Sequence, residues 1–161
     1  MNRFFIILFM LATTGFSENK WDSKLISDSL RKDAKAVIRL CSTTYERSSV
    51  ENFTEEIHFV ITVMNEKGDP AANLRITYDR NSKVGPVEGN LYDKNGELTY
   101  EIKKKDLSDY AYNNDFTLFS DNRVKVYSPS CNNYPYTVEY KYSVEHKGIT
   151  GFGTWAPQRG Y

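Results

Sequence analysis

The chain has 161 residues, of which 40% are apolar, 14% aromatic and 26% charged, a mixture typical of one globular domain rather than a disordered tail. Its 21 Lys and Arg residues balance its 21 Asp and Glu residues, so no basic excess exists to neutralise a nucleic-acid backbone, and we expect no nucleic-acid partner. The nine glycines and five prolines follow no period, which excludes collagen-like and low-complexity classes.

Residues 1–17 have the pattern of a secretory signal peptide. Arg3 provides the positive start, residues 4–12 form an apolar run, and Gly15 and Ser17 form a small-x-small cleavage motif. The run of nine residues is much shorter than the roughly 20 that cross a bilayer, so we expect cleavage rather than a retained membrane helix. The mature chain would have 144 residues, with 20 basic and 21 acidic side chains. We therefore expect a periplasmic or secreted protein with no transmembrane segment after cleavage of the leader.

The first part of the mature chain changes from a helical to a strand-like period. Residues 22–35 have apolar side chains at helical spacing and suit one short helix or an irregular lead-in. From residue 36 the period becomes two, and strands are predicted over residues 36–45 and 54–64. Asn and Gly within residues 65–69 tolerate positive φ, so a hairpin-like return is predicted there.

The rest of the chain continues the strand pattern. Strands are predicted over residues 74–78 and 98–102, and the sequence Asp-Lys-Asn-Gly at residues 93–96 is a hairpin signal between them. The clearest strand is the last, because residues 136–147 alternate strictly over twelve positions. The other predictions are a turn or helical cap at 106–109, a loop at 110–115, and extended segments at 116–119 and 123–127.

This succession of strands and turns predicts an all-β fold. The expected architecture is an antiparallel β-sandwich of about seven or more strands, or a barrel, with a short helical or irregular lead-in at the N-terminus. The sandwich domain is expected over residues 18–147. A chain of this size buries close to 70% of its unfolded surface, so no metal or disulfide is required to hold it together.

The two cysteines, Cys41 and Cys131, allow two interpretations. In an oxidising compartment they could form a disulfide, which the loop-closure model values at around 4 kcal/mol, or they could remain two free thiols. A nucleophilic cysteine would need a histidine, and His58 and His146 are the only candidates. Neither Cys-x-x-Cys nor His-x-x-x-His spacing occurs, so we expect no metal site, no cofactor and no catalytic residue.

Tyrosine is unusually frequent, with twelve residues that are concentrated in the last third of the chain. Such rings favour strands and ordinarily fill sandwich cores with the hydroxyl at the rim. Tyrosines on loops can instead bind sugars or peptides. Tyr110, Tyr112 and Tyr134 fall on predicted loops and are therefore the candidate binding tyrosines.

Several segments together resemble a known family. These are Asp106 to Tyr110, Leu118 to Lys125, Tyr136 to Tyr142 and Thr154 to Gln158, preceded by a first-strand pattern from Asp33 to Leu40. The chain resembles domain of unknown function 3857, a β-rich module that in exported bacterial proteins precedes a transglutaminase-like core. The resemblance spans about residues 21–161.

The resemblance implies a module without chemistry of its own. In longer members of the family the catalytic Cys, His and Asp follow the module, and no residues here match them. We therefore expect a non-catalytic β-sandwich that supports or docks with a transglutaminase-like domain or a cell-envelope protein. Residues 148–161, with Phe152 and Trp155, would be a docking or linker segment.

Two other functions remain open at this point. One is a carbohydrate-binding module in which the loop tyrosines Tyr110 and Tyr112 stack on a glycan. The other, ranked last, is an enzyme that works through Cys41 or Cys131.

Overall fold

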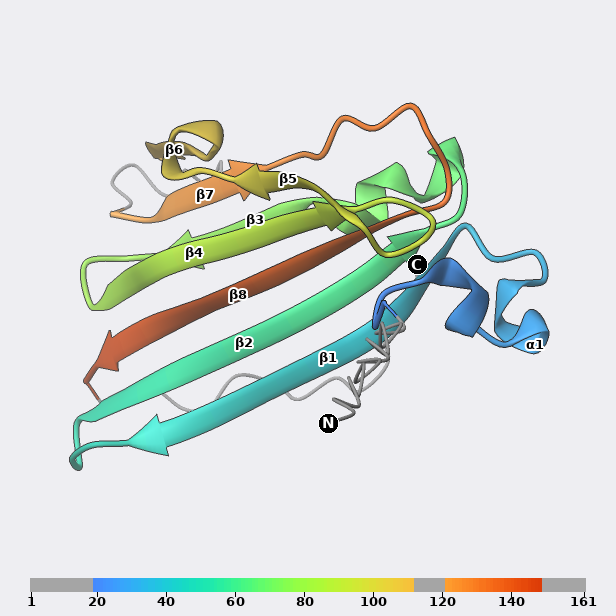
Figure 1. The fold of residues 1–161 in the computed structure, drawn as a ribbon. Coiled ribbons are helices and arrows are strands. Elements are labelled where there is room, and N and C mark those ends of the chain that lie inside the picture. The colour runs from blue at the N-terminus through green and yellow to red at the C-terminus, as the bar shows by residue number, and fades with distance from the viewer. Residues whose placement is uncertain (1–18, 112–120, 149–161) are drawn as a thin grey trace, which may run out of the picture.

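The computed structural model describes residues 19–111 and 121–148, which form two packed antiparallel sheets (Figure 1). The five-stranded sheet has the order β1 (Ala36–Arg47), β2 (Asn52–Val63), β8 (Tyr136–Lys147), β4 (Ser82–Tyr92) and β5 (Leu98–Ile102). The three-stranded sheet has the order β3 (Leu74–Tyr78), β7 (Arg123–Tyr127) and β6 (Ser108–Ala111). The all-β antiparallel sandwich expected from the sequence is confirmed.

The last described strand, β8, lies in the middle of the five-stranded sheet. It pairs with β2 on one side and with β4 on the other. Tyr136, Val138, Tyr140 and Val144 are each no more than 4% exposed, and they point toward the three-stranded sheet. The strict alternation of residues 136–147 therefore identified a central strand that buries one face in the core.

The core lies between the two sheets and includes tyrosine as well as aliphatic side chains. Ile61 and Val138 from the larger sheet pack with Leu74 and Ile76 from β3. Burial of each such side chain contributes roughly 1.5–3 kcal/mol. The Tyr140 ring is 1% exposed, and its hydroxyl donates to a backbone carbonyl in the segment before β3 at 2.8 Å. The expectation that tyrosines fill the core is met here, but the Tyr140 hydroxyl is bonded inside the core rather than at its rim.

The predicted hairpin return at residues 65–69 is wrong. That segment begins the 3₁₀ helix η2 (Glu66–Ala72), which carries the chain from β2 across to β3 in the other sheet. Asn65 caps this helix, because its side-chain oxygen accepts from the Lys67 amide at 3.1 Å. Gly68 packs against the Lys35 carbonyl, where a Cβ atom would lie only 2.0 Å from the oxygen. Asn and Gly thus serve a helix start and a close contact rather than a two-residue turn.

Most of β4 has no counterpart among the predicted strands. Its first residues include Gly85 and Pro86, which break the usual strand pattern. The structure accommodates them in a bulge, where the register with β8 shifts between Val84 and Val87. The predicted turn at residues 93–96 is confirmed: it joins β4 to β5, the Asp93 carboxylate accepts from two backbone amides at 2.9 Å, and Gly96 has φ +77°.

The short helical or irregular lead-in predicted over residues 22–35 is present before β1 as two separate short pieces. It consists of η1 (Ser23–Leu25) and α1 (Asp28–Arg31). The Ser23 hydroxyl donates to the Lys94 carbonyl at 2.9 Å, so this lead-in is anchored on the β4–β5 turn. No helix in the described part of the chain is both long and apolar enough to traverse a bilayer.

Two predictions concern the segment before β7. The turn predicted at 106–109 corresponds to η3 (Lys104–Asp106) and the start of β6 (Ser108–Ala111). Of the loop predicted at 110–115, residues 110 and 111 belong to β6 instead, and residues 112–115 lie outside the described residues. The extended segment predicted at 116–119 and the leader at 1–17 lie outside the described residues.

Candidate functional site

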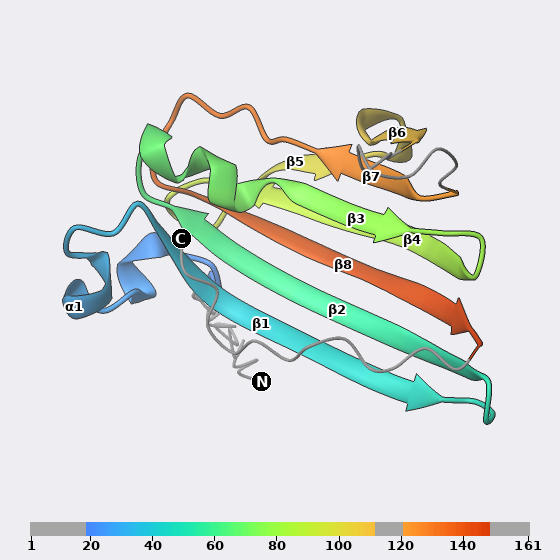
Figure 2. The same cartoon turned by 180° about the vertical axis from the view of Figure 1, so that it is seen from behind.

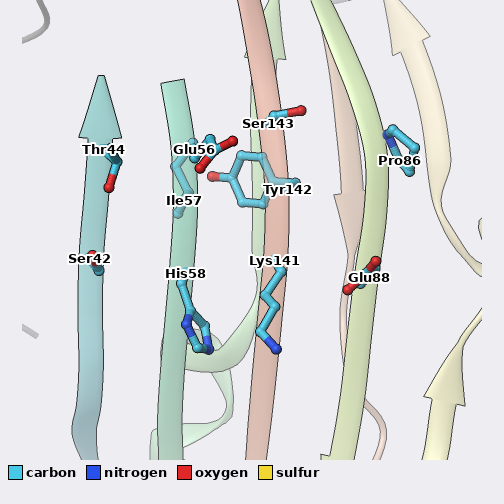
Figure 3. A pocket seen from close by; sticks show the side chains of 10 residues that line it. All are labelled: Ser42, Thr44, Glu56, Ile57, His58, Pro86, Glu88, Lys141, Tyr142 and Ser143. Atoms are coloured by element: carbon cyan, nitrogen blue, oxygen red, sulfur yellow. The ribbon is translucent and has the colours of Figure 1, made fainter. Parts of the chain in front are cut away.

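The outer face of the five-stranded sheet, which points away from the three-stranded sheet, is polar over its central strands. The register aligns Ser42 on β1, His58 on β2, Lys141 on β8 and Glu88 on β4 in one row, and cross-strand neighbours share a face. This row lies in a groove of about 380 Å³ (Figure 3). We call it the outer groove, and its lining residues are Ser42, Thr44, Glu56, Ile57, His58, Pro86, Glu88, Lys141, Tyr142 and Ser143.

A buried carboxylate lies next to the outer groove. Among the described residues, Glu139 is the only charged side chain that is buried, with 6% of its surface exposed. Its Oε1 lies 2.7 Å from Nε2 of His58 and 3.4 Å from Nζ of Lys141. The Tyr92 hydroxyl donates to Oε2 at 2.7 Å. These contacts join β2, β8 and β4 through one side chain.

The partners of Glu139 keep it ionised. Burial by itself raises the pKa of Glu139, but the hydrogen bonds from Tyr92 and His58 and the charge of Lys141 outweigh burial and hold the pKa below its ordinary value. Burial and the hydrogen bond to Glu139 raise the pKa of Tyr92 to about 12. At neutral pH the site therefore holds a carboxylate that accepts from a neutral phenol.

The N-terminal lead-in covers the end of this face beyond Glu139. Thr62 and Thr137 are buried there, with their hydroxyl oxygens 2.8 Å apart. Arg39 donates to the Thr62 hydroxyl at 3.4 Å and to the Asp22 carbonyl at 3.3 Å, and its guanidinium lies 5.8 Å from the centre of the Trp21 ring. The lead-in thus covers one end of the outer face, and no residue of the lead-in lines the outer groove.

The polar groups of this face mainly hold strands together. His58 directs Nε2 at Glu139, and no hydrogen bond within the described structure joins His58 to the opposite Ser42. A serine nucleophile would require that bond. The exposed Glu88 and Lys141 face each other across β4 and β8 and provide a surface of mixed charge. The arrangement can bind polar groups, but it lacks an activated nucleophile among these residues.

A second cleft, of about 520 Å³, lies where β8 begins, and it contains two residues singled out from the sequence. Cys131 and Tyr134 both line it. The hydroxyls of Tyr134 and Tyr136 donate to the two oxygens of Asp69 at 2.7 and 2.9 Å. The Asp69 contact is the main reason that the pKa of Tyr134 is raised to about 12. Asp69 thus fastens η2 to the start of β8.

The disulfide interpretation of the two cysteines is not what the structure contains. Cys41 and Cys131 are both free thiols. Cys41 lies on β1, two strands away from β8, whereas Cys131 lies in the segment that leads into β8. The register places Cys41 level with Tyr140, four residues beyond the start of β8, whereas Cys131 precedes that start.

The candidate binding tyrosines are not brought together. Tyr110 is 49% exposed, but it lies on strand β6 rather than on a loop. Tyr134 is half-buried and bonded to Asp69, which corrects the expectation that it is exposed. Tyr112, Phe152 and Trp155 lie outside the described residues. The structure therefore does not assemble a stacking platform from Tyr110 and Tyr134.

The sequence analysis did not identify Glu139 and Asp69, the two carboxylates that join separate elements of the fold. The alternation of residues 136–147 places Glu139 on the side of the last strand that carries polar residues, and nothing in that alternation shows that the residue is buried. A carboxylate between Val138 and Tyr140, in a strand otherwise suited to the core, was the only available signal. Its partner His58 is 81 positions away, so the pairing depends on strand register.

Comparisons with known proteins identify the family. The family model described as Domain of Unknown Function with solved-structure structure (DUF3857) matches residues 50–157. This range is more than half of the chain, so the chain belongs to this family, as the resemblance of its sequence segments predicted. The comparison with curated proteins finds no match.

A solved structure shares the fold at low sequence identity. It is a chain from Parabacteroides distasonis ATCC 8503 described as a "putative protease", with a TM-score of 0.62 and 11% identity. The match covers 71% of this chain and 23% of that chain. The matched part of this chain therefore corresponds in fold to about a quarter of that longer chain.

Proposed function

We propose that this member of the DUF3857 family is an exported, non-catalytic β-sandwich module that supports a hydrolase-type domain, such as a transglutaminase-like domain, or docks with a cell-envelope protein. Its fold corresponds to 23% of a chain described as a "putative protease", so the likeness involves one part of a much longer protein. This partial correspondence suits a module that works beside another domain.

The observation that carries the proposal is the separation of every cysteine from every histidine. All four residues lie within the described structure. Cys41 on β1 is opposite Phe59 on β2, and both point to the inner face of the five-stranded sheet. His58 points to the outer face of that sheet, as Glu139 does. His146 pairs with Phe53, which lies six positions along β2 from Phe59, the residue opposite Cys41.

Cys131 is separated from both histidines as well. It lies in the cleft at the start of β8, and no histidine lines that cleft. A cysteine nucleophile needs an adjacent base. The thiols and imidazoles of this fold therefore do not form a catalytic pair.

The partner contact is proposed at the edge of the three-stranded sheet. β6 is an edge strand, and all four of its residues are exposed. An edge strand offers unpaired backbone groups to a partner, and Tyr110 adds a large exposed ring. A neighbouring domain can use this edge without disturbing the core.

The first experiment tests catalysis. Purified residues 18–161 are incubated with fluorescein-labelled casein, with and without prior treatment with iodoacetamide. We expect no hydrolysis above the buffer rate in either sample. Hydrolysis that alkylation abolishes would overturn the non-catalytic assignment.

The second experiment tests docking. The tagged protein is cross-linked in its native cells, and captured proteins are identified by mass spectrometry. We expect capture of a protein with a hydrolase-type domain, reduced at least fivefold by Tyr110→Glu. The matched control is Val50→Glu, which changes a 75% exposed residue in the β1–β2 loop and should leave capture unchanged. Equal capture by both variants, or no such partner, would contradict the proposed docking edge.

A further inference from the structure

The second cleft, at the end of the sandwich where β8 begins, has the size of a ligand site. Figures 1 and 2 show the β4–β5 turn and the segment that leads into β8 together at this end. One wall of the cleft comes from the end of β4 and this turn, and the other comes from residues 131–136. Its volume of about 520 Å³ lies within the range of roughly 300–1,000 Å³ that is typical of small-ligand pockets.

Hydrogen bonds to neighbouring elements hold both walls of the cleft in place. The amide and hydroxyl of Ser23 donate to the Lys94 carbonyl at 3.0 and 2.9 Å, so the N-terminal lead-in fixes the turn. On the other wall, the hydroxyls of Tyr134 and Tyr136 donate to Asp69 in η2. The shape of the cleft is thus set by the fold itself, and a preformed site saves part of the ordering cost of binding.

Two amide side chains of the cleft have no partner within the described structure. Asn132 and Asn133 are exposed, and their carboxamides make no hydrogen bond with any described residue. A carboxamide both donates and accepts, so these side chains match the N–H and C=O groups of a peptide. The half-buried Tyr92 and Pro135 line the same cleft and provide apolar surface for a side chain.

The charges of the cleft favour an anionic ligand. Its charged lining residues within the described structure are Asp93 and Lys94. The Asp93 carboxylate already accepts from the backbone amides of Asn95 and Glu97, each at 2.9 Å. Lys94 is exposed, and its ammonium has no ion pair with any described residue. A carboxylate can therefore bind Lys94 without displacing an existing partner.

We propose that the second cleft binds the C-terminus of a peptide, with the terminal carboxylate at Lys94 and the last amide groups at Asn132 and Asn133. A peptide end combines the three features that match this cleft: a negative charge, amide groups and a side chain that can be apolar. The cleft is separate from the β6 edge, so the inference does not rest on the docking contact proposed there.

Selection from a peptide mixture tests the need for a carboxylate. The immobilised mature chain is incubated with N-acetylated tripeptides that are randomised at the last two positions, either as free acids or as C-terminal amides. Retained peptides are identified by mass spectrometry. We expect particular acids to be retained, and their amides to be retained roughly tenfold less. No retained acid, or equal retention of acids and amides, would overturn the proposal.

Matched variants test the residues of the cleft. The affinity of a selected acid is measured by calorimetry. Lys94→Gln should weaken binding by roughly tenfold, and Asn132→Ala combined with Asn133→Ala by roughly fivefold. The matched control is Lys105→Gln, which removes the same charge from an exposed position in η3 and should change the affinity by less than about twofold. Equal affinities of the parent and Lys94→Gln would contradict the proposal.

Cys131 reports whether the peptide occupies this cleft. In a Cys41→Ser background, the rate of N-ethylmaleimide labelling of the half-buried Cys131 is measured with and without a saturating selected acid. We expect labelling to be at least threefold slower with the acid and unchanged with the same concentration of its amide. An acid that binds without slowing the labelling would place the peptide elsewhere on the molecule and overturn the proposal.

Discussion

Replacement of Glu139 by glutamine should lower the free energy of unfolding, because it removes the negative charge while keeping the size and shape of the side chain. Glu139 is 6% exposed and accepts from Tyr92 and His58, each at 2.7 Å. Hydrogen bonds to charged groups contribute about 1.5–3 kcal/mol and neutral ones about 0.5–1.5 kcal/mol. Two weakened bonds therefore predict a loss of about 2 kcal/mol in the free energy of unfolding.

The assay is urea unfolding of the mature chain followed by circular dichroism. Glu139→Gln should lower the free energy of unfolding in urea by about 2 kcal/mol, which in a parallel thermal scan corresponds to a melting temperature lower by about 4–8 °C for a domain of this size. The matched control is Glu88→Gln, one row away on the same face, where the exposed side chain should change stability by less than about 0.5 kcal/mol. A double-mutant cycle with Tyr92→Phe should give a coupling of about 1 kcal/mol.

The pH dependence supplies an independent check. The folded state holds the pKa of Glu139 below its ordinary value, so its contribution is present above about pH 4.5 and is lost as the pH falls through the folded pKa. The stability difference between the parent and Glu139→Gln should therefore shrink below pH 4. The reasoning would be refuted by a Glu139→Gln variant as stable as Glu88→Gln, or by a coupling of zero with Tyr92.

Three further predictions follow from local contacts. Gly68→Ala should lower stability by at least 2 kcal/mol in urea unfolding, because the new Cβ would clash with the Lys35 carbonyl; an unchanged midpoint would contradict the close packing. Hydrogen bonds from Lys125, Tyr78 and Arg123 outweigh burial and lower the pKa of Asp109 to about 2, so its contribution is present above about pH 4 and fades toward pH 2. Asp109→Asn should thus lower the urea midpoint at pH 7 but not at pH 2, whereas an equal loss at both would exclude the charge as the cause. Thiol titration of the unfolded chain should count two free cysteines, and a melting temperature that falls with reductant would contradict the free state of Cys41 and Cys131.

The sequence predicted strands and turns correctly where the preference of consecutive residues agrees with their place in the fold. Residues 136–147 alternate because one side of β8 faces the core. The Asp-Lys-Asn-Gly turn is held by hydrogen bonds between its own backbone and side chains. β4 was missed because Gly85 and Pro86 oppose strand formation locally, and only the neighbouring strand makes a bulge there favourable. Asn65 was misassigned for a related reason, since the same side chain can start a turn or cap a helix.

The sequence by itself determined the class of fold, because period-two burial is a property of consecutive residues. Tertiary structure alone decided that β8 lies between β2 and β4. This placement brings Glu139 to His58 and Tyr92, and it also puts Cys41 and Cys131 out of reach of each other. Those relations depend on the register of strands far apart in the chain, and a shift of one residue would move each side chain to the opposite face.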